Sequence, residues 1–98
     1  MSEVDEDFYQ RADAHIMLSN EQMTEDVGSN KVNASFMFSV ARFNAWISAA
    51  GFDNAAEMML EKEQIIEFFV EKYKGMLEDN LNDYITHFDQ YMKEDNDS

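Results

Sequence analysis

The stretch "FSVARFNAW" places Arg42 in a segment that otherwise carries almost no charge. A guanidinium group binds carboxylates and phosphates through a planar fork of N–H donors, so an isolated arginine of this kind can build an anion site. Counting back across an expected turn near the first glycine puts Arg42 opposite Asp13 and His15, and Asn44 follows two residues later. We therefore predict a buried polar cluster of Arg42, Asp13, His15 and Asn44, for which binding of an anion or of the C-terminus of a partner is the alternative, functional interpretation.

The first interpretation of Arg42 is a structural ion pair that fixes the register of the helices. A buried charge without a partner costs about 3 to 5 kcal/mol, so a buried arginine requires a carboxylate. Asp13 supplies one on one side, and the same count across a second turn places Arg42 opposite Glu61 to Glu63. If Asp13 is the partner, Arg42→Met is tolerated only when Asp13 is also neutralised, which thermal melts of the single and double variants would show.

The other polar residues match no catalytic or metal-binding motif. A di-iron helical bundle needs a Glu three residues before an inward-facing His, but Ala12 and Tyr84 stand at those positions before His15 and His87. The chain has no Cys, no Gly-x-Ser-x-Gly elbow and no phosphate-binding glycine loop. We predict no catalytic, cofactor-binding or metal-ligating residues, and a protein that is not an enzyme.

The charge balance limits the classes of partner. Twenty-one acidic and seven basic residues give a formal net charge of -14, which repels phosphate backbones and anionic lipid surfaces. We therefore expect no direct binding of nucleic acid or membranes. The alternative is that this protein is an acidic decoy or regulator, and its partner is then a basic protein. The acidic N-terminus does not match a secretory signal, so we expect a cytoplasmic location.

Positioning these residues requires helices, and the composition predicts an all-α fold. The chain has no Pro, only three Gly, and no strand-like alternation. We expect a bundle of three helices over residues 5–24, 31–50 and 53–92, the second being apolar on several sides and therefore central. Four local features are expected at the helix ends: acids Asp5 to Asp7 in a first turn, a cap at Ser29 or Asn30, a left-handed Gly51, and a cap at Asp53 or Asn54, the latter with Glu57 three residues later.

The third segment carries the longest apolar stripe. It consists of residues at steps of three or four, namely Ile66, Val70, Tyr73, Leu77, Leu81, Tyr84, Phe88 and Tyr91. Two shorter helices cannot cover such a stripe, so its C-terminal half either packs on a second subunit or the chain breaks near Gly75 or at "EDNLND" and folds back. Unbroken periodicity through Gly75 favours a continuous helix and a homo-oligomer.

Three segments carry a resemblance to a known family. They are "DFYQRADAHIMLSNEQ", "VNASFMFSVARFNAW" and "YKGMLEDNLNDYITHFDQYM". Together they resemble a family of small, acidic, uncharacterised proteobacterial proteins, classed as a domain of unknown function, over residues 7–92. The resemblance implies a bacterial, cytoplasmic protein without an assigned activity, and it supplies no catalytic residues.

The length of 98 residues predicts a single helical domain over residues 1–98, with flexible ends at 1–4 and 93–98. Because no site chemistry is specified, the sequence leaves the function unknown. The function class that fits best is a non-catalytic protein acting through self-association or protein–protein interaction. A small-ligand protein or enzyme built around Arg42 is the weaker alternative.

Overall fold

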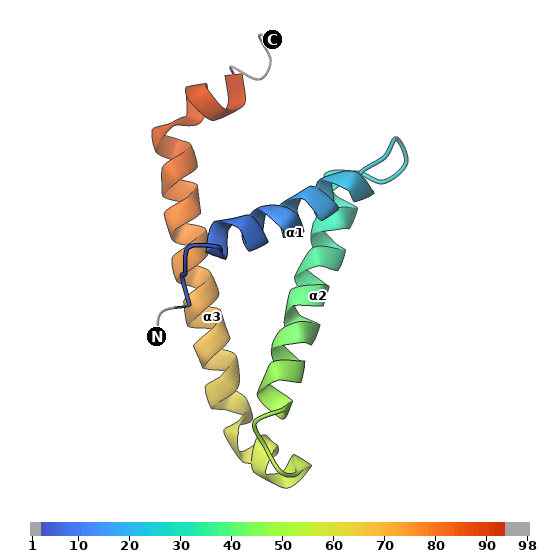
Figure 1. Cartoon of the computed structure of the whole chain (residues 1–98), viewed down its shortest axis with the longest axis vertical. Helices are drawn as coiled ribbons and strands as arrows, with labels where there is room; N and C mark the ends of the chain where they lie inside the picture. Colours follow the sequence, from blue (N-terminus) through green and yellow to red (C-terminus); the bar gives the residue numbers. More distant parts are fainter. Residues whose placement is uncertain (1–2, 94–98) are drawn as a thin grey trace. The chain divides into compact units, whose positions relative to one another are not determined.

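A computed structural model describes residues 3–93, which form helices and loops and contain no β-strand. In chain order the elements are α1 (Phe8–Gln22), α2 (Ser29–Ala49), α3 (Ala55–Thr86) and a short π-helix, η1 (Asp89–Lys93) (Figure 1). The all-α prediction is confirmed, and three of the helices are substantial. The arrangement of the three as a bundle stays a prediction.

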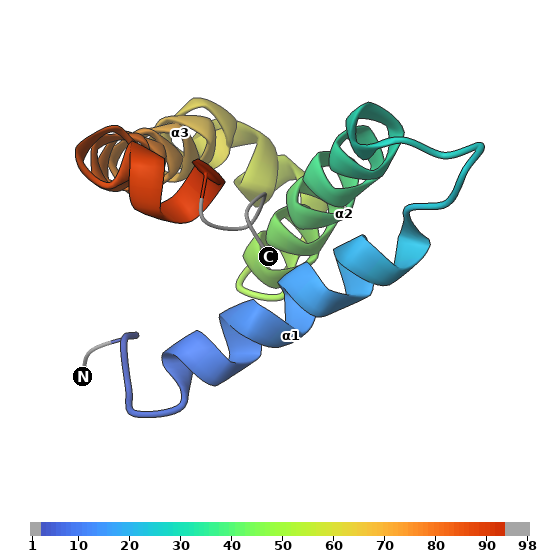
Figure 2. The same cartoon turned by 90° about the horizontal axis from the view of Figure 1, so that it is seen from above.

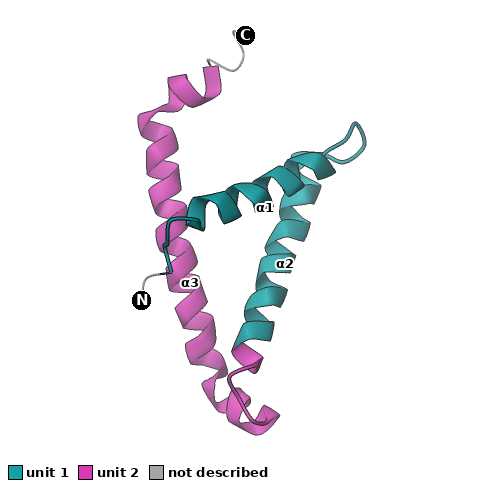
Figure 3. Cartoon of the chain, in the orientation of Figure 1, with its two compact units in different colours: residues 1–47 teal, residues 48–98 magenta. Residues whose placement is uncertain are grey.

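The chain divides into two compact units, Met1–Ile47 and Ser48–Ser98 (Figure 3). The first contains α1 and most of α2, and the second contains α3 and η1. A single domain over residues 1–98 stays a prediction. Of the expected flexible ends, residues 1, 2 and 94–98 lie outside the described residues, and Lys93 is the last residue of η1.

The start of α1 differs from the prediction. The helix begins at Phe8, so Asp5 and the two acids after it precede the first turn instead of forming it. The backbone explains this start, because the N–H of Phe8 donates to the carbonyl of Asp5 at 3.2 Å in a turn that the helix then continues. Asp5 also holds this turn through its side chain, whose Oδ1 lies 2.8 Å from Nη2 of Arg11.

A loop over residues 23–28 connects α1 to α2 and is visible from above in Figure 2. The hydroxyl oxygen of Thr24 accepts hydrogen bonds from the N–H groups of Asp26 and Val27, at 3.2 and 3.1 Å. Ser29 is the first residue of α2 and not its cap, because the carbonyl of Gly28 already accepts the N–H of Val32 at 3.3 Å. The predicted cap at Ser29 or Asn30 is therefore wrong.

Val32 provides the centre of the small apolar contact in unit 1. Its exposed fraction is 5%, and no other residue among 3–93 is buried. The rings of His15 on α1 and Phe36 on α2 lie 6.4 Å apart, which ties the two helices together. Trp46 on α2 is 66% exposed, and the expectation that α2 is the central helix stays a prediction.

The connection from α2 to α3 is a tight turn without a left-handed residue. The N–H groups of Gly51 and Phe52 donate to the carbonyls of Ser48 and Ala49, both at 3.1 Å. These bonds satisfy the last carbonyls of α2 in the three-residue spacing of a 3-10 turn, so Gly51 keeps a negative φ, as does every non-terminal residue that the structure describes. The prediction of a left-handed conformation for Gly51 is therefore wrong.

α3 confirms one predicted cap and the predicted continuity. The side-chain Oδ1 of Asn54 accepts the N–H of Glu57 at 2.9 Å, as the capping pattern indicated. The helix runs through Gly75 without a break, so the alternatives of a break there or at "EDNLND" are excluded. It ends at Thr86, six residues before the predicted end at Met92, because His87 leaves the helical conformation and η1 follows.

Candidate functional site

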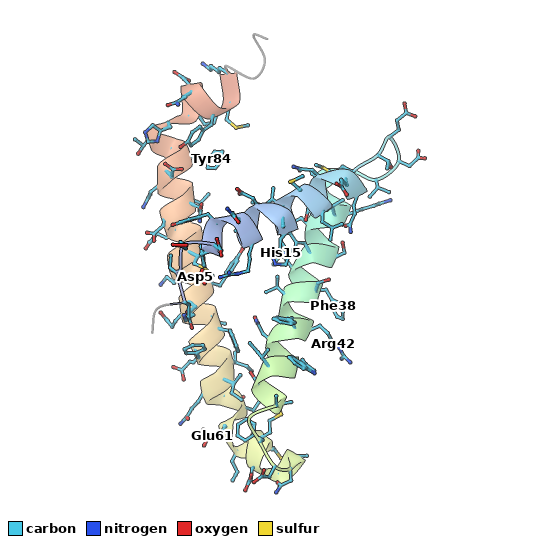
Figure 4. All side chains as sticks on the ribbon, in the orientation of Figure 1. Asp5, His15, Phe38, Arg42, Glu61 and Tyr84 are labelled. Atoms are coloured by element: carbon cyan, nitrogen blue, oxygen red, sulfur yellow. The ribbon has the colours of Figure 1, made fainter. Side chains whose placement is uncertain are left out.

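The four residues of the predicted cluster all lie in unit 1, and none of them is buried. Asp13 and His15 are on α1 and Arg42 is on α2, all exposed, and Asn44 is half-buried. Among residues 3–93, no hydrogen bond or ion pair joins Arg42 to Asp13 or to His15. The structure therefore shows Arg42 and Asp13 as exposed side chains and not as a buried ion pair. Arg42 on α2 and His15 on α1 are labelled in Figure 4.

The register of α1 against α2 explains why the cluster does not assemble. The loop over residues 23–28 has its midpoint between Glu25 and Asp26, and His15 and Phe36 lie equally far from it. The sequence count had placed the turn at Gly28, which shifts every expected partner of α2 by several residues. Phe36 and Arg42 are also six residues apart, which places them about 120° apart around a helix. Arg42 therefore lies off the face that meets α1.

Pairing of Arg42 with Glu61 or Glu63 stays a prediction, because these acids belong to the second unit. In the part of the chain that the structure describes, no three His, Asp or Glu side chains gather closely enough to hold a metal ion. None of the helices within residues 3–93 is long and apolar enough to cross a membrane.

The most extensive candidate surface is apolar and lies on α3. Every residue from 71 to 90 is exposed. We call six residues of the predicted stripe the α3 stripe; they are 42% to 56% exposed and comprise Ile66, Val70, Tyr73, Leu77, Leu81 and Tyr84. Contiguous exposed apolar surface of this kind is typical of a protein interaction site. The sequence identified the stripe, and each of its six side chains is at least 42% exposed in the structure.

A polar and aromatic cluster at the end of α3 was missed from the sequence. The hydroxyl of Tyr91 in η1 donates to the carboxylate of Asp83 at 3.2 to 3.3 Å, and the Nδ1 of His87 lies 3.2 Å from the same carboxylate. The ring centroids of Tyr84 and Tyr91 are 4.9 Å apart. Desolvation and the neighbouring Asp83 raise the pKa of the Tyr91 phenol. Asp83 and His87 are four residues apart on one helix face, and their contact lies on the surface of the chain.

This cluster joins the C-terminal end of α3 to η1. Phe88 and Tyr91 continue the three- and four-residue spacing of the stripe. For that reason the sequence pattern did not reveal that the helix ends before them. No Pro or Gly marks the position, so only the hydrogen bonds of Asp83 reveal it. The hydrogen bond to Asp83 fixes the position of Tyr91 just after the end of α3. We therefore interpret this cluster as a structural contact.

Comparison with known proteins decides the family. A family model described as "Protein of unknown function (DUF3144)" matches residues 8–85, which is most of the chain. The chain belongs to the DUF3144 family. The resemblance seen in the sequence is thereby confirmed, and the family description assigns its members no activity or ligand.

A solved structure extends this relation beyond the DUF3144 match. The NMR structure of a protein from Shewanella sp is 36% identical in sequence, with a TM-score of 0.77, and the similarity covers 92% of this chain and 95% of that one. A search of curated proteins found no match. Function must therefore be argued from the surface that this DUF3144 protein presents.

Proposed function

We propose that this protein is non-catalytic and acts through self-association, with the α3 stripe as the surface that joins two copies. The observation that carries the proposal is the exposure of the stripe, none of whose six members is less than 42% exposed. Apolar surface gains about 25 cal/mol for each Å² removed from water. Burying this apolar surface against a second copy would therefore favour association strongly.

The small core supports the same proposal. Val32 is the one buried side chain among residues 3–93, whereas a stable domain of this size needs a substantial apolar core. Helix lengths indicate which partner fits: α3 has 32 residues, α2 has 21 and α1 has 15. At 1.5 Å per residue these helices are about 48, 32 and 22 Å long. The helix that matches α3 in length is the α3 of a second copy.

The non-catalytic part of the proposal is supported by the dispersal of the reactive side chains. Asp13, His15 and Arg42, the residues best suited to bind or transfer charge, make no hydrogen bond or ion pair with one another in the described chain. Catalysis requires such groups to be held in a fixed mutual geometry. The proposal also includes a cytoplasmic location and a bacterial origin, the latter supported by the neighbour from Shewanella.

The alternative function is the binding of a basic protein by the acidic surface of this chain. A net charge of -14 steers a basic partner, and that attraction weakens as salt screens it. Self-association of two acidic chains has the opposite dependence, because salt screens their mutual repulsion. Measuring self-association and capture of a basic protein at low and moderate salt separates the two functions.

A pair of charge variants tests the proposed surface directly. Leu77→Lys places a charge in the middle of the α3 stripe, and we expect the mass from light scattering to fall to that of a single chain of 11.4 kDa. Asn82→Lys is the matched control, because it adds the same charge about 140° away around the helix. The control should keep the mass of the unmodified protein. Equal masses for both variants and the unmodified protein would refute the stripe as the association surface.

A further inference from the structure

The middle of α3 has a seven-residue pattern that is suited to pairing with another helix. In heptad notation Glu63, Val70 and Leu77 occupy one seam position, and Ile66, Tyr73 and Asn80 occupy the other. The four apolar members belong to the α3 stripe and are 42% to 56% exposed. The seam is therefore apolar at its centre and polar at each end.

The two polar residues distinguish a parallel from an antiparallel pair. In a parallel pair each seam residue meets its own copy, so Glu63 faces Glu63 of the second copy, and two like charges must share a desolvated site. In an antiparallel pair with its two-fold axis between Glu71 and Lys72, Glu63 faces Asn80 of the second copy. The amide of Asn80 can then donate to the carboxylate of Glu63, which satisfies both polar groups.

The same register pairs the apolar residues. Val70 faces Tyr73 of the second copy, and Ile66 faces Leu77 of the second copy, so large side chains meet in every central layer. The two helices could also shift by one heptad relative to each other, in either direction. A shift in one direction places Asn80 opposite Val70 of the second copy, and a shift in the other places Glu63 opposite Tyr73 of the second copy. Either shift leaves a polar group without a partner at an apolar site. One antiparallel register therefore satisfies the whole seam.

The residues that flank the seam have complementary charges in this register. Lys62 comes next to Asp83 of the second copy, and Glu67 comes next to Lys74 of the second copy, each pair occurring twice by symmetry. None of Lys62, Glu67 and Lys74 forms an ion pair within residues 3–93. Asp83 already accepts from Tyr91, and a carboxylate has acceptor sites for a further donor.

We propose that α3 pairs antiparallel with the α3 of a second copy of this chain, with the two-fold axis between Glu71 and Lys72. This inference rests on the proposed self-association and specifies its geometry. The seam from Glu63 to Asn80 forms the contact, and the charge pairs on its flanks set the direction. The predicted assembly is a two-fold symmetric one in which the same surface serves both copies.

Cysteine cross-linking tests the direction, and the absence of Cys from the chain makes single variants clean. The variants Ile66→Cys and Leu77→Cys are oxidised separately and as a mixture that has first exchanged subunits. In the proposed pair, two copies of position 66 are about 16 Å apart along the axis, beyond the Cα separation of about 7 Å that a disulfide tolerates. We expect covalent dimers from the mixture and few from either variant alone. Asn82→Cys, on the opposite side of the helix, controls for random collision.

Each outcome of this experiment bears on the geometry separately from the proposed function. Efficient cross-linking of either single variant would show a parallel pair and overturn the inference, while leaving self-association intact. Association by light scattering without cross-linking above the Asn82→Cys control would show that the seam is not the contact, which also overturns it. A single-chain mass for the unmodified protein would instead refute the proposed function itself.

A charge exchange provides a second test that leaves the apolar seam unchanged. Glu67→Lys should place lysine against Lys74 of the second copy and raise the dissociation constant about tenfold at low salt. The double variant Glu67→Lys with Lys74→Glu restores opposite charges and should return the constant to within about threefold of the original. In a parallel pair these two positions do not face each other, so rescue is not expected there. Equal weakening by the single and double variants would contradict the antiparallel register.

Discussion

The side chains of Asp5 and Arg11 form an ion pair, with Oδ1 of Asp5 2.8 Å from Nη2 of Arg11. Both side chains are 56% exposed, so the pair is a local clamp on the turn before α1 and not part of a core. The hydrogen bond from Arg11 holds the pKa of the Asp5 carboxyl below its ordinary value. This turn explains how three acids precede the helix without forming its first turn.

The lowered pKa of Asp5 predicts how the clamp responds to acid. A carboxylate whose pKa is lower in the folded chain stabilises that state above the unfolded value of about 3.9, and this stabilisation is lost as the pH falls through the folded value. An NMR titration of Asp5 should therefore give a midpoint below about 3.9. In Arg11→Gln the midpoint should move up towards that value. An unchanged midpoint in the variant would show that Arg11 is not the cause.

The exposure of Arg42 changes what its removal should do. The sequence predicted that Arg42→Met would be tolerated only with a second change at Asp13, because a buried pair was expected. The structure shows both residues exposed and unconnected, so we expect Arg42→Met and Asp13→Asn each to change the free energy of unfolding by less than about 0.5 kcal/mol. Urea unfolding of the single and double variants should give additive changes. A clear coupling energy between the two substitutions would instead show that Arg42 and Asp13 form an ion pair.

At the scale of elements, local signals were predictable where one side chain determines the geometry. Asn54 caps α3 because its short amide reaches the N–H of Glu57, and this spacing is readable in the sequence. Continuity through Gly75 followed from the unbroken apolar period. The conformation of Gly51 was not predictable, since a 3-10 turn and a left-handed cap both satisfy the last carbonyls of a helix.

The partners across helices were less predictable than the helices. The cluster around Arg42 depended on a register counted from Gly28, and the loop is centred before that glycine. The hydroxyl oxygen of Thr24 accepts hydrogen bonds from the N–H groups of Asp26 and Val27 within this loop, a local effect that the count ignored. The end of α3 likewise depends on the contacts of Tyr91 with Asp83 and Tyr84, which join residues seven and eight positions apart.

Gly75 offers a test of α3 as an element. A Cβ added there meets no atom within 4 Å, and the backbone has a negative φ that any residue adopts. Gly75→Ala should therefore raise the free energy of unfolding by about 1 kcal/mol through helix propensity. Gly28→Ala is the matched control, because alanine is a poor residue at the start of a helix and should be destabilising there. Destabilisation by Gly75→Ala in urea unfolding would argue against a continuous α3.

At the scale of the whole molecule, one chain leaves most of its apolar side chains in contact with water. The sequence predicted that the C-terminal half of the long helix needed another cover, and the exposure of residues 71–90 agrees with that. It did not predict how exposed α2 is, because its aromatic residues were expected to form a core. Composition indicates how much apolar surface exists, but the arrangement of helices decides which part of it is covered.

Sedimentation equilibrium of the unmodified protein is the most direct test of self-association. Over micromolar concentrations and moderate salt, we expect a mass of twice 11.4 kDa that falls towards one chain only on strong dilution. A mass of 11.4 kDa at every concentration, with the helical circular dichroism signal retained, would contradict it.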